Sequence, residues 1–436
     1  MVTSEQTKYP YRPVKDVAQV SEKTDRAEKL WLRGQPQPLH VHRIPIRHLF
    51  FNIENGRYAD RMLQLRADNP SENIDARSPV WRTQILHMLR GTYKGSKTTE
   101  GTHPDKAPFE KLKEDVKART QLKPGIVTTD GGVLDGNRRL AALLTLASEE
   151  KTNPTEYEYF EGVILPFNTT AEDRWAIEAG RQLGKDEPLD YPPICELLKI
   201  RQGLAIFGGS RGVQSNTPYE RVAQVLGFGT TAAMVSDMAE RLQLIDEYLT
   251  FFGIPCQYHQ VAGLNERFIE FQKNLKTAAP RQSPARFAQL KVLHFLLIKG
   301  QVMTNWELRK INIALGGGRS RKPMTDALVP LLNSIPAPDK AKNAVANGTV
   351  DEVVVGLADA AATFIGEVED GERSNKPIML IKGVHSRLRT ISDALAKRPL
   401  PTECRREFQD FVAKCDRLIR DVRVAASKAS GRQCRR

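Results

Sequence analysis

The sequence predicts an α+β domain at the N-terminal end of the chain, followed by domains that are mostly α-helical. Three observations predict this fold class. Short strand-like segments, rich in β-branched and apolar residues, lie between residues 41 and 167. A turn, Asp130-Gly131-Gly132, separates two of them and is typical of a hairpin. Beyond residue 190, apolar residues recur instead at the spacing of amphipathic helices.

Length and composition limit the classes of protein that this chain can be. It has 436 residues, of which 40% are hydrophobic and 27% charged, so a disordered chain is excluded and two or three domains are expected. The net charge of +13 favours an anionic partner, most simply nucleic acid. Neither an apolar signal segment nor a run long enough to span a membrane is seen, so we expect a cytoplasmic protein without a membrane partner.

The N-terminal domain is predicted over residues 36–185, after a polar leader over residues 1–35 with weak periodicity. Its first strand is expected at Val41–Ile46. An insertion over about residues 60–107 combines a helix around Trp81–Leu89 with a loop rich in Gly, Lys and Thr.

The most informative part of this domain follows the insertion. A helix is expected over Phe109–Arg119, and strands over Gly125–Thr129 and Val133–Asp135. An apolar helix begins near Leu140, and another strand is expected over Tyr157–Phe167. The pattern therefore alternates strands and helices before the chain becomes wholly helical.

Two helical domains complete the predicted organisation. The first, over residues 186–300, contains a helix-turn-helix pattern at residues 218–249, with Gly227-Phe228-Gly229 as the turn. The second, over residues 301–436, contains a helical hairpin at residues 383–426, broken near Pro399. We expect this amphipathic hairpin to mediate either a homodimer or packing within the chain.

The segment Asp135-Gly136-Asn137-Arg138-Arg139 has the chemistry of a phosphate site. Glycine lets a ligand approach the backbone between strand and helix, and the first N–H groups of the helix favour an anion. Arg138 and Arg139 add donors that match phosphate geometry. The same residues also suit an ordinary strand-to-helix turn with two solvated arginines.

This segment resembles the N-terminal domain of ParB-type partition proteins. Lys123–Val127 and Val133–Leu143 follow the family pattern, with Gly136, Arg139 and Ala142 on its G-x-x-R-x-x-A positions. Together with the helix-turn-helix that follows, the resemblance covers about residues 42–250. It implies a ParB/sulfiredoxin fold.

The resemblance also implies a nucleotide site. It suggests that a nucleoside triphosphate, most simply CTP with Mg²⁺, binds to Gly136, Asn137, Arg138 and Arg139. Glu178 lies where the family has the glutamate of an E-N-x-Q-R segment and is the candidate metal ligand here, although Ala179 replaces the metal-binding asparagine that follows it in the family. Asp135 is the other candidate catalytic carboxylate. Sulfiredoxin chemistry is not expected, because Asn137 stands where that enzyme has cysteine, and no P-loop is present.

Double-stranded DNA is the expected partner of the helix-turn-helix. Its candidate contact residues are polar or basic and lie in or beside the two helices, together with a basic loop further along the chain: Thr230, Thr231, Ser236, Arg221, Arg241, Arg319 and Arg321.

Three hypotheses of function stay open at this point. The first is a ParB-like DNA-binding protein that responds to nucleotide, in partition or a mobile element. The second is a metal-dependent NTPase, for example a slow CTPase, or a nuclease of an anti-phage defence system. The third is a helical adaptor whose ParB-like domain no longer binds nucleotide.

Overall fold

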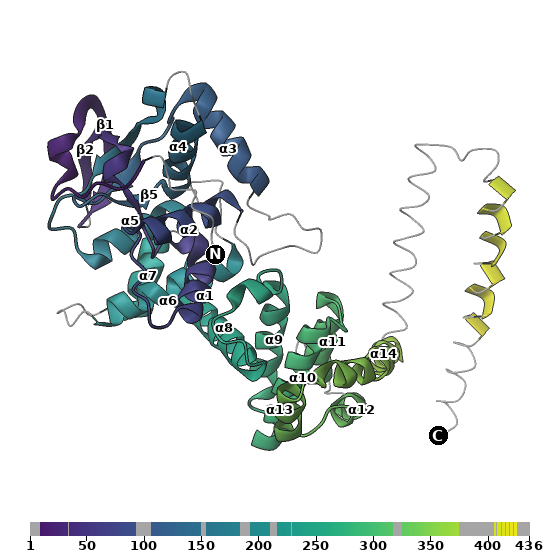
Figure 1. Ribbon diagram of the computed structural model, residues 1–436. Helices are drawn as coiled ribbons and strands as arrows, with labels where there is room; N and C mark the ends of the chain where they lie inside the picture. Colours follow the sequence, from purple (N-terminus) through teal and green to yellow (C-terminus); the bar gives the residue numbers. More distant parts are fainter. Residues whose placement is uncertain are drawn as a thin grey trace. The chain divides into compact units, whose positions relative to one another are not determined.

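The N-terminal half of the chain is organised around a six-stranded mixed β-sheet (Figure 1). This computed structural model describes residues 9–33, 35–92, 106–149, 154–183, 192–209, 216–227, 229–316, 325–374 and most of 405–424. The strands are β1 (Glu22–Leu32), β2 (Gln35–Pro45), β3 (Phe50–Phe51), β4 (Gly125–Val127), β5 (Gly132–Asp135) and β6 (Tyr159–Ile164).

The strands lie in the order β1-β2-β6-β4-β5-β3. The pairs β1–β2, β2–β6 and β4–β5 are antiparallel, whereas β6–β4 and β5–β3 are parallel. The predicted strands on either side of the Asp130-Gly131-Gly132 turn are confirmed as β4 and β5. Gly131 has a φ of +93°, which explains why glycine is required in that turn.

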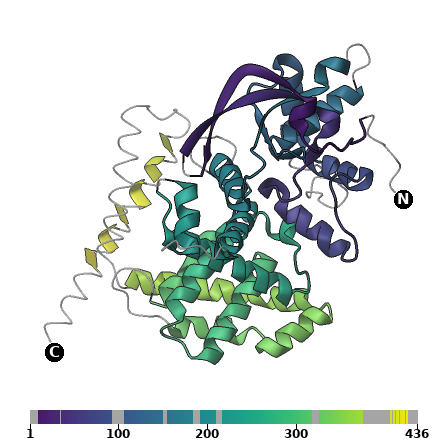
Figure 2. The ribbon, with the colours of Figure 1, turned by 90° about the vertical axis from the view of Figure 1, so that its left-hand side faces the viewer.

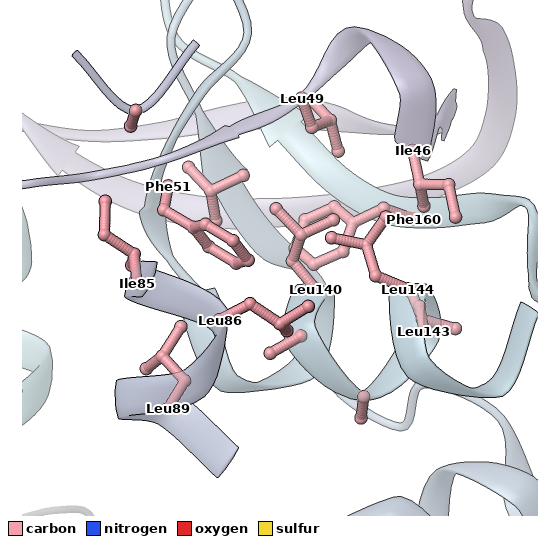
Figure 3. Close-up of a cluster of buried hydrophobic side chains, with 14 of the residues drawn as sticks. Ile46, Leu49, Phe51, Ile85, Leu86, Leu89, Leu140, Leu143, Leu144 and Phe160 are labelled. Atoms are coloured by element: carbon pink, nitrogen blue, oxygen red, sulfur yellow. The ribbon is translucent and has the colours of Figure 1, made fainter. Parts of the chain in front are cut away.

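Apolar side chains fill both faces of the sheet. The larger cluster joins the sheet to α1 (Ala59–Asp68), α2 (Pro79–Arg90), α3 (Lys106–Arg119) and α4 (Asn137–Glu149). Figure 3 shows Phe51 and Phe160 of the sheet against Leu140 and Leu144 of α4. A smaller cluster on the other side includes Ile177 of α5 (Ala171–Leu183). The sheet is therefore covered by helices on both sides, and the β5–α4 connection emerges at its edge.

The first strand departs from the sequence analysis. Residues 1–35 were expected to be a polar leader, but Glu22–Leu32 forms β1, one of the longest strands of the sheet. Charged side chains occur at both odd and even positions of β1, so the alternation of apolar and polar residues that marks a strand is not visible in the sequence. The reason is that β1 is an edge strand with most of its residues exposed. Its partner β2 likewise extends the predicted strand back to Gln35. Figure 2 shows this pair running out beyond the rest of the sheet.

The remainder of the described chain is helical, as predicted. Its longer helices are α6 (Pro193–Gly209), α7 (Pro218–Leu226), α8 (Ala232–Phe251), α9 (Asn265–Ala278), α10 (Pro284–Gly300), α11 (Asn305–Ala314), α13 (Pro338–Ala346) and α14 (Val350–Ser374), with a short α12 (Leu328–Asn333). The predicted fold class, α+β followed by mostly helical structure, is confirmed at this level. Among the helices that the structure describes, none combines the length and apolar character of a membrane span.

Helix α6 is longer than the sequence indicates. Gly203, Gly208 and Gly209 lie in a stretch whose composition predicts a flexible loop over Gly203–Thr217, but the helix continues to Gly209. Gly203 is there for close packing, since a Cβ at this position would lie 2.3 Å from Cζ2 of Trp175 on α5. A glycine that allows two elements to approach was thus mistaken for a helix end.

The chain divides into two compact units, residues 1–364 and residues 365–436. The predicted ranges 36–185 and 186–300 both lie in the first unit. In the second, the described residues between 405 and 424 are helical, whereas the first arm of the predicted hairpin at 383–426 lies outside the described residues.

Candidate functional site

A groove of about 1040 Å³ runs past the β5–α4 turn. Its walls come from α3, the turn itself, the end of α5 and the loop after β3. Acidic side chains are few in this groove, where Asp115 and Asp135 are the two that line it. Seven basic side chains line it: Arg57, Lys111, Arg119, Lys123, Arg138, Arg139 and Arg181. The groove therefore has the charge of an anion site.

The backbone of the turn is fixed by Gly136. Its φ is +99°, and an added Cβ would lie 2.9 Å from Cζ of Phe160 and 3.1 Å from Nη2 of Arg139. The amide of Leu140 donates to the carbonyl of Gly136 at 2.9 Å, which starts helix α4. The first N–H groups of α4 are thus presented beside the groove, where the helix dipole favours negative charge.

The buried side chain of Asn137 stabilises the turn by hydrogen bonds. It is 4% exposed, and its Nδ2 donates to the carbonyl of Val133 at 2.8 Å. Its Oδ1 accepts from the amide of Asn52 at 3.0 Å. The side chain of Asn137 therefore hydrogen-bonds to the loop after β3 and to strand β5. Because these bonds engage the side chain, Asn137 would contact a ligand through its backbone and at the rim of the groove.

Asp135 organises the arginines of the groove. Its Oδ2 lies 3.2 Å from Nη2 of Arg139 and 3.0 Å from Nη1 of Arg181, and its Oδ1 accepts from Gln182 at 2.9 Å. The carboxylate is 7% exposed, so these contacts are screened little by solvent. Arg181 also contacts Glu28 at 2.6 Å. Asp135 thus acts here as a positioning residue for two guanidinium groups.

Helix α3 supplies the opposite wall. Lys111 lines the groove from an exposed position, and Arg119 pairs with Asp115 one turn earlier. Leu112, Val116 and Leu122 add an apolar strip to the same wall, and Leu122 is 58% exposed. A ligand with an apolar or aromatic part and an anionic part would match both walls.

Glu178 lies away from this groove, although it shares helix α5 with Arg181 and Gln182. It borders a separate cavity of about 380 Å³ and is 2% exposed. Its Oε2 lies 2.8 Å from Nζ of Lys199 on α6, which is equally buried, and its Oε1 accepts from the amide of Gly56 at 3.0 Å. Burial, together with the charge of Glu178, raises the pKa of Tyr58 nearby.

Asp135 lines the groove whereas Glu178 lines the separate cavity, so the two candidate carboxylates do not share one site. Within the described ranges, no group of three or more His, Cys, Asp or Glu side chains could hold a metal ion. Both acids that line the groove are ion-paired with arginine. The groove residues therefore do not fit a protein-held metal.

The predicted helix-turn-helix is present as α7 and α8. Thr217 and Glu220 form a capping box at the start of α7, with Thr217 accepting from the amide of Glu220 at 3.3 Å. Thr231 caps α8 by accepting from the amide of Met234 at 3.2 Å. Thr231 is exposed, and the other two polar candidates, Thr230 and Ser236, are partly exposed at the same end of α8.

The arginines of this pair lie against the protein. Arg221 pairs with Glu172 and lies 4.4 Å over the ring of Phe207. Arg241 is largely buried, and burial lowers its pKa in spite of nearby Asp237, Glu196 and Glu266. The structure therefore assigns both arginines to internal packing. The predicted contacts Arg319 and Arg321 lie outside the described residues.

Asp237 and Glu240 would repel phosphate if they faced it. Lys276 of α9 contacts both of them, with Nζ 2.8 Å from Oε2 of Glu240. Their charge is thus partly compensated within the protein.

Sequence reasoning did not find Arg57, Lys111, Arg181 or Gln182 as groove residues. Only the tertiary fold places these residues beside the β5–α4 turn, because they lie 25 to 80 residues from it along the chain or on other elements. The one local signal is the basic character of α3, which has five Lys or Arg among its 14 residues. Comparisons of the chain with protein-family models, with curated proteins and with solved structures find no match.

Proposed function

We propose that this chain is a ParB-like DNA-binding protein that binds the phosphates of a nucleoside triphosphate in the groove beside the β5–α4 turn. The observation that supports this most strongly is the convergence of seven basic side chains on the start of a helix whose preceding glycine has a positive φ. Helix starts and arginine clusters are recurrent phosphate-binding devices. Nucleotide binding would then favour one arrangement of the protein over another.

The chemistry of the groove suggests how such a ligand would lie. The phosphates would face Arg138, Arg139 and the first turn of α4, and the base and sugar would lie along the apolar strip of α3. CTP is the nucleotide that the ParB resemblance favours. Mg²⁺ would arrive coordinated by the phosphates, since both acids of the groove are engaged by arginines.

Two observations favour DNA as the partner: the net charge of the chain and the order of its elements along the sequence. The net charge of +13 favours a polyanion, and the α7–α8 pair follows the α+β part as a DNA reader does in ParB proteins. A homodimer through the C-terminal helices belongs to the same proposal.

The test is a binding and turnover assay with CTP, ATP, GTP and UTP, with and without Mg²⁺ and duplex DNA. Two substitutions on one helix make a matched pair: Lys111→Gln removes a charge that lines the groove, and Lys117→Gln removes an exposed charge that does not. We expect the first to weaken nucleotide binding several-fold and the second to leave it unchanged.

The outcomes separate the three hypotheses. Saturable binding of one nucleotide that Lys111→Gln and Arg139→Ala both weaken supports the proposal. Metal-dependent turnover or DNA nicking would select the enzyme alternative. If no nucleotide binds to the folded protein under any condition, the proposal fails and the adaptor hypothesis takes its place.

A further inference from the structure

Strands β1 and β2 form a two-stranded ribbon beyond the point where the sheet ends. Strand β6 pairs with β2 only over Val41–Pro45, whereas β1 pairs with β2 at Arg43 and His42 and then continues from His40 back to Gln35. One face of this ribbon is packed: Leu30 and Leu32 are buried in a cluster with Ile177 of α5. The ribbon is thereby held firmly on one side.

The opposite face of the ribbon is exposed throughout. Cross-strand partners share a face, and the register pairs Ala27 with His40, Lys29 with Pro38 and Trp31 with Pro36. All six of these residues are exposed, and we call them the ribbon face: Ala27, Lys29, Trp31, Pro36, Pro38 and His40. Trp31 is 66% exposed, so its indole, which combines a large apolar surface with a hydrogen-bond donor, is accessible to a partner.

Basic residues dominate the segment that runs from the end of β1 through β2, whereas the earlier part of β1 also carries Glu22, Asp25 and Glu28. No Asp or Glu occurs from Lys29 to Ile53, a stretch that carries four Lys or Arg and three His. Elsewhere in the chain acids are frequent, with 52 among 436 residues. An exposed indole set among cations, with no acid in the segment, matches a nucleic acid better than a protein surface of mixed charge.

The ribbon also adjoins the predicted DNA reader. Lys29 and Trp31 line a hollow of about 550 Å³ together with Gln224 and Val225 of α7. The hollow is also lined by Arg221, which pairs with Glu172, so the edge of the ribbon and the helix-turn-helix border one surface. The ribbon adds Lys29 to the cations of this surface.

We propose that the ribbon face is a DNA-contacting surface, with Lys29 and Arg33 on phosphates and Trp31 against the duplex. A two-stranded ribbon has dimensions that the major groove accepts. This inference rests on the proposed DNA partner, but it assigns the contact to a strand pair instead of to α7–α8 alone.

Tryptophan fluorescence gives a direct test. Two of the four tryptophans, Trp81 and Trp175, are buried, whereas Trp306 is 67% exposed, almost the same as Trp31. In a Trp306→Phe protein, acrylamide quenching therefore reports on Trp31. We expect a fluorescein-labelled duplex of mixed sequence to reduce that quenching at least twofold.

Binding of the same duplex to variants provides the second readout. Trp31→Thr should weaken binding about tenfold, and Trp306→Thr should not. Lys29→Gln should reduce the slope of log K against log salt by about 0.9, whereas Lys342→Gln, which removes an exposed charge on α13, should not. Unchanged thermal unfolding of Trp31→Thr would show that the fold is retained.

Two results would overturn the inference, and they are distinguishable. In the first, the duplex binds but Trp31 stays accessible to acrylamide and Trp31→Thr binds equally well. The ribbon face would then not be the DNA-contacting surface, although DNA would remain a partner. If the wild-type protein binds no duplex even at low salt, the ribbon face and the DNA part of the proposed function both fail. The nucleotide assay then still tests separately whether the groove binds a nucleotide.

Discussion

Arginines that the sequence marks for anion binding lie in two regions of this molecule, the β5–α4 turn and the α7–α8 pair. In the first region Arg138 and Arg139 line a groove of about 1040 Å³. In the second, Arg221 packs on Phe207 and pairs with Glu172, while Arg241 is largely buried. All four arginines are partly exposed, so the two regions differ in what surrounds these side chains: the first two border the groove, and the second two pack among acids or against Phe207.

The neighbouring acids account for the difference. Asp135 is a single carboxylate shared by two arginines in the groove. Around α7 and α8, Glu172 of α5 pairs with Arg221, while Glu196 of α6 and Glu266 of α9 lie near Arg241. In the groove, seven basic side chains border a cavity that two acids line, so the local excess of positive charge favours an anion, which a motif alone does not reveal.

The largest expected effect is on stability, and it concerns the ion pair that joins α5 to α6 between the two regions. Glu178 on α5 and Lys199 on α6 are each 2% exposed and form a buried ion pair. Lys199→Met leaves the carboxylate buried without its cation, so the free energy of unfolding should fall by about 3–5 kcal/mol. Urea unfolding measures it.

The double variant Glu178→Gln/Lys199→Met is the control for this link. Because it removes both charges together, it should lose clearly less stability than Lys199→Met. Equal losses would mean that packing, and not the charge pair, joins the two regions.

A smaller effect separates the two turns. Gly136 and Gly227 have φ values of +99° and +87°, but only at Gly136 would a Cβ meet other atoms, with Cζ of Phe160 at 2.9 Å. Gly227→Ala should cost about 1 kcal/mol from backbone strain, because a φ of +87° with a ψ of −166° is nearly confined to glycine. Gly136→Ala should cost about 2 kcal/mol and weaken nucleotide binding as well. Thermal unfolding of the two variants gives the comparison, and equal costs would contradict the role of close packing at Gly136.

The smallest effect concerns Arg221. Its ion pair and ring contact are partly exposed, so Arg221→Met should lower the free energy of unfolding by about 1 kcal/mol. Its effect on DNA binding should be small, because the guanidinium is engaged by Glu172 and Phe207 even though it borders the same hollow as Lys29 and Trp31. A decrease of about one in the salt slope of duplex binding would show instead that Arg221 reaches phosphate, and the contrast between the two regions would be lost.

Local patterns were sufficient for the elements nearest the candidate site. The glycines of the β4–β5 turn, the strand before Gly136 and the helix after it were predicted because each depends on residues adjacent in the sequence. Strand β1 was missed because an exposed edge strand needs no apolar period. Helix α6 was predicted too short because Gly203 serves packing against Trp175.

The groove itself was predictable only in part. The turn from Asp135 to Arg139 was found, but the role of Asp135 depends on Arg181 and Gln182, 46 and 47 residues away. Glu178 was expected near a metal, and its pairing with Lys199 follows from the packing of α5 on α6, which the sequence pattern does not specify.

The path of hydrogen bonds from Asn137 to Lys199 has a consequence for dissecting the molecule. Asn137 accepts from the amide of Asn52, the side chain of Asn52 donates to Glu178 at 3.4 Å, and Glu178 is neutralised by Lys199. A fragment that stopped at the natural-looking boundary before α6 would keep the acid and discard its counter-ion. The smallest fragment that folds by itself and retains the groove should therefore end at Gly209, the last residue of α6. Helix α6 then belongs structurally to the N-terminal α+β part, although the sequence assigns it to the following helical domain.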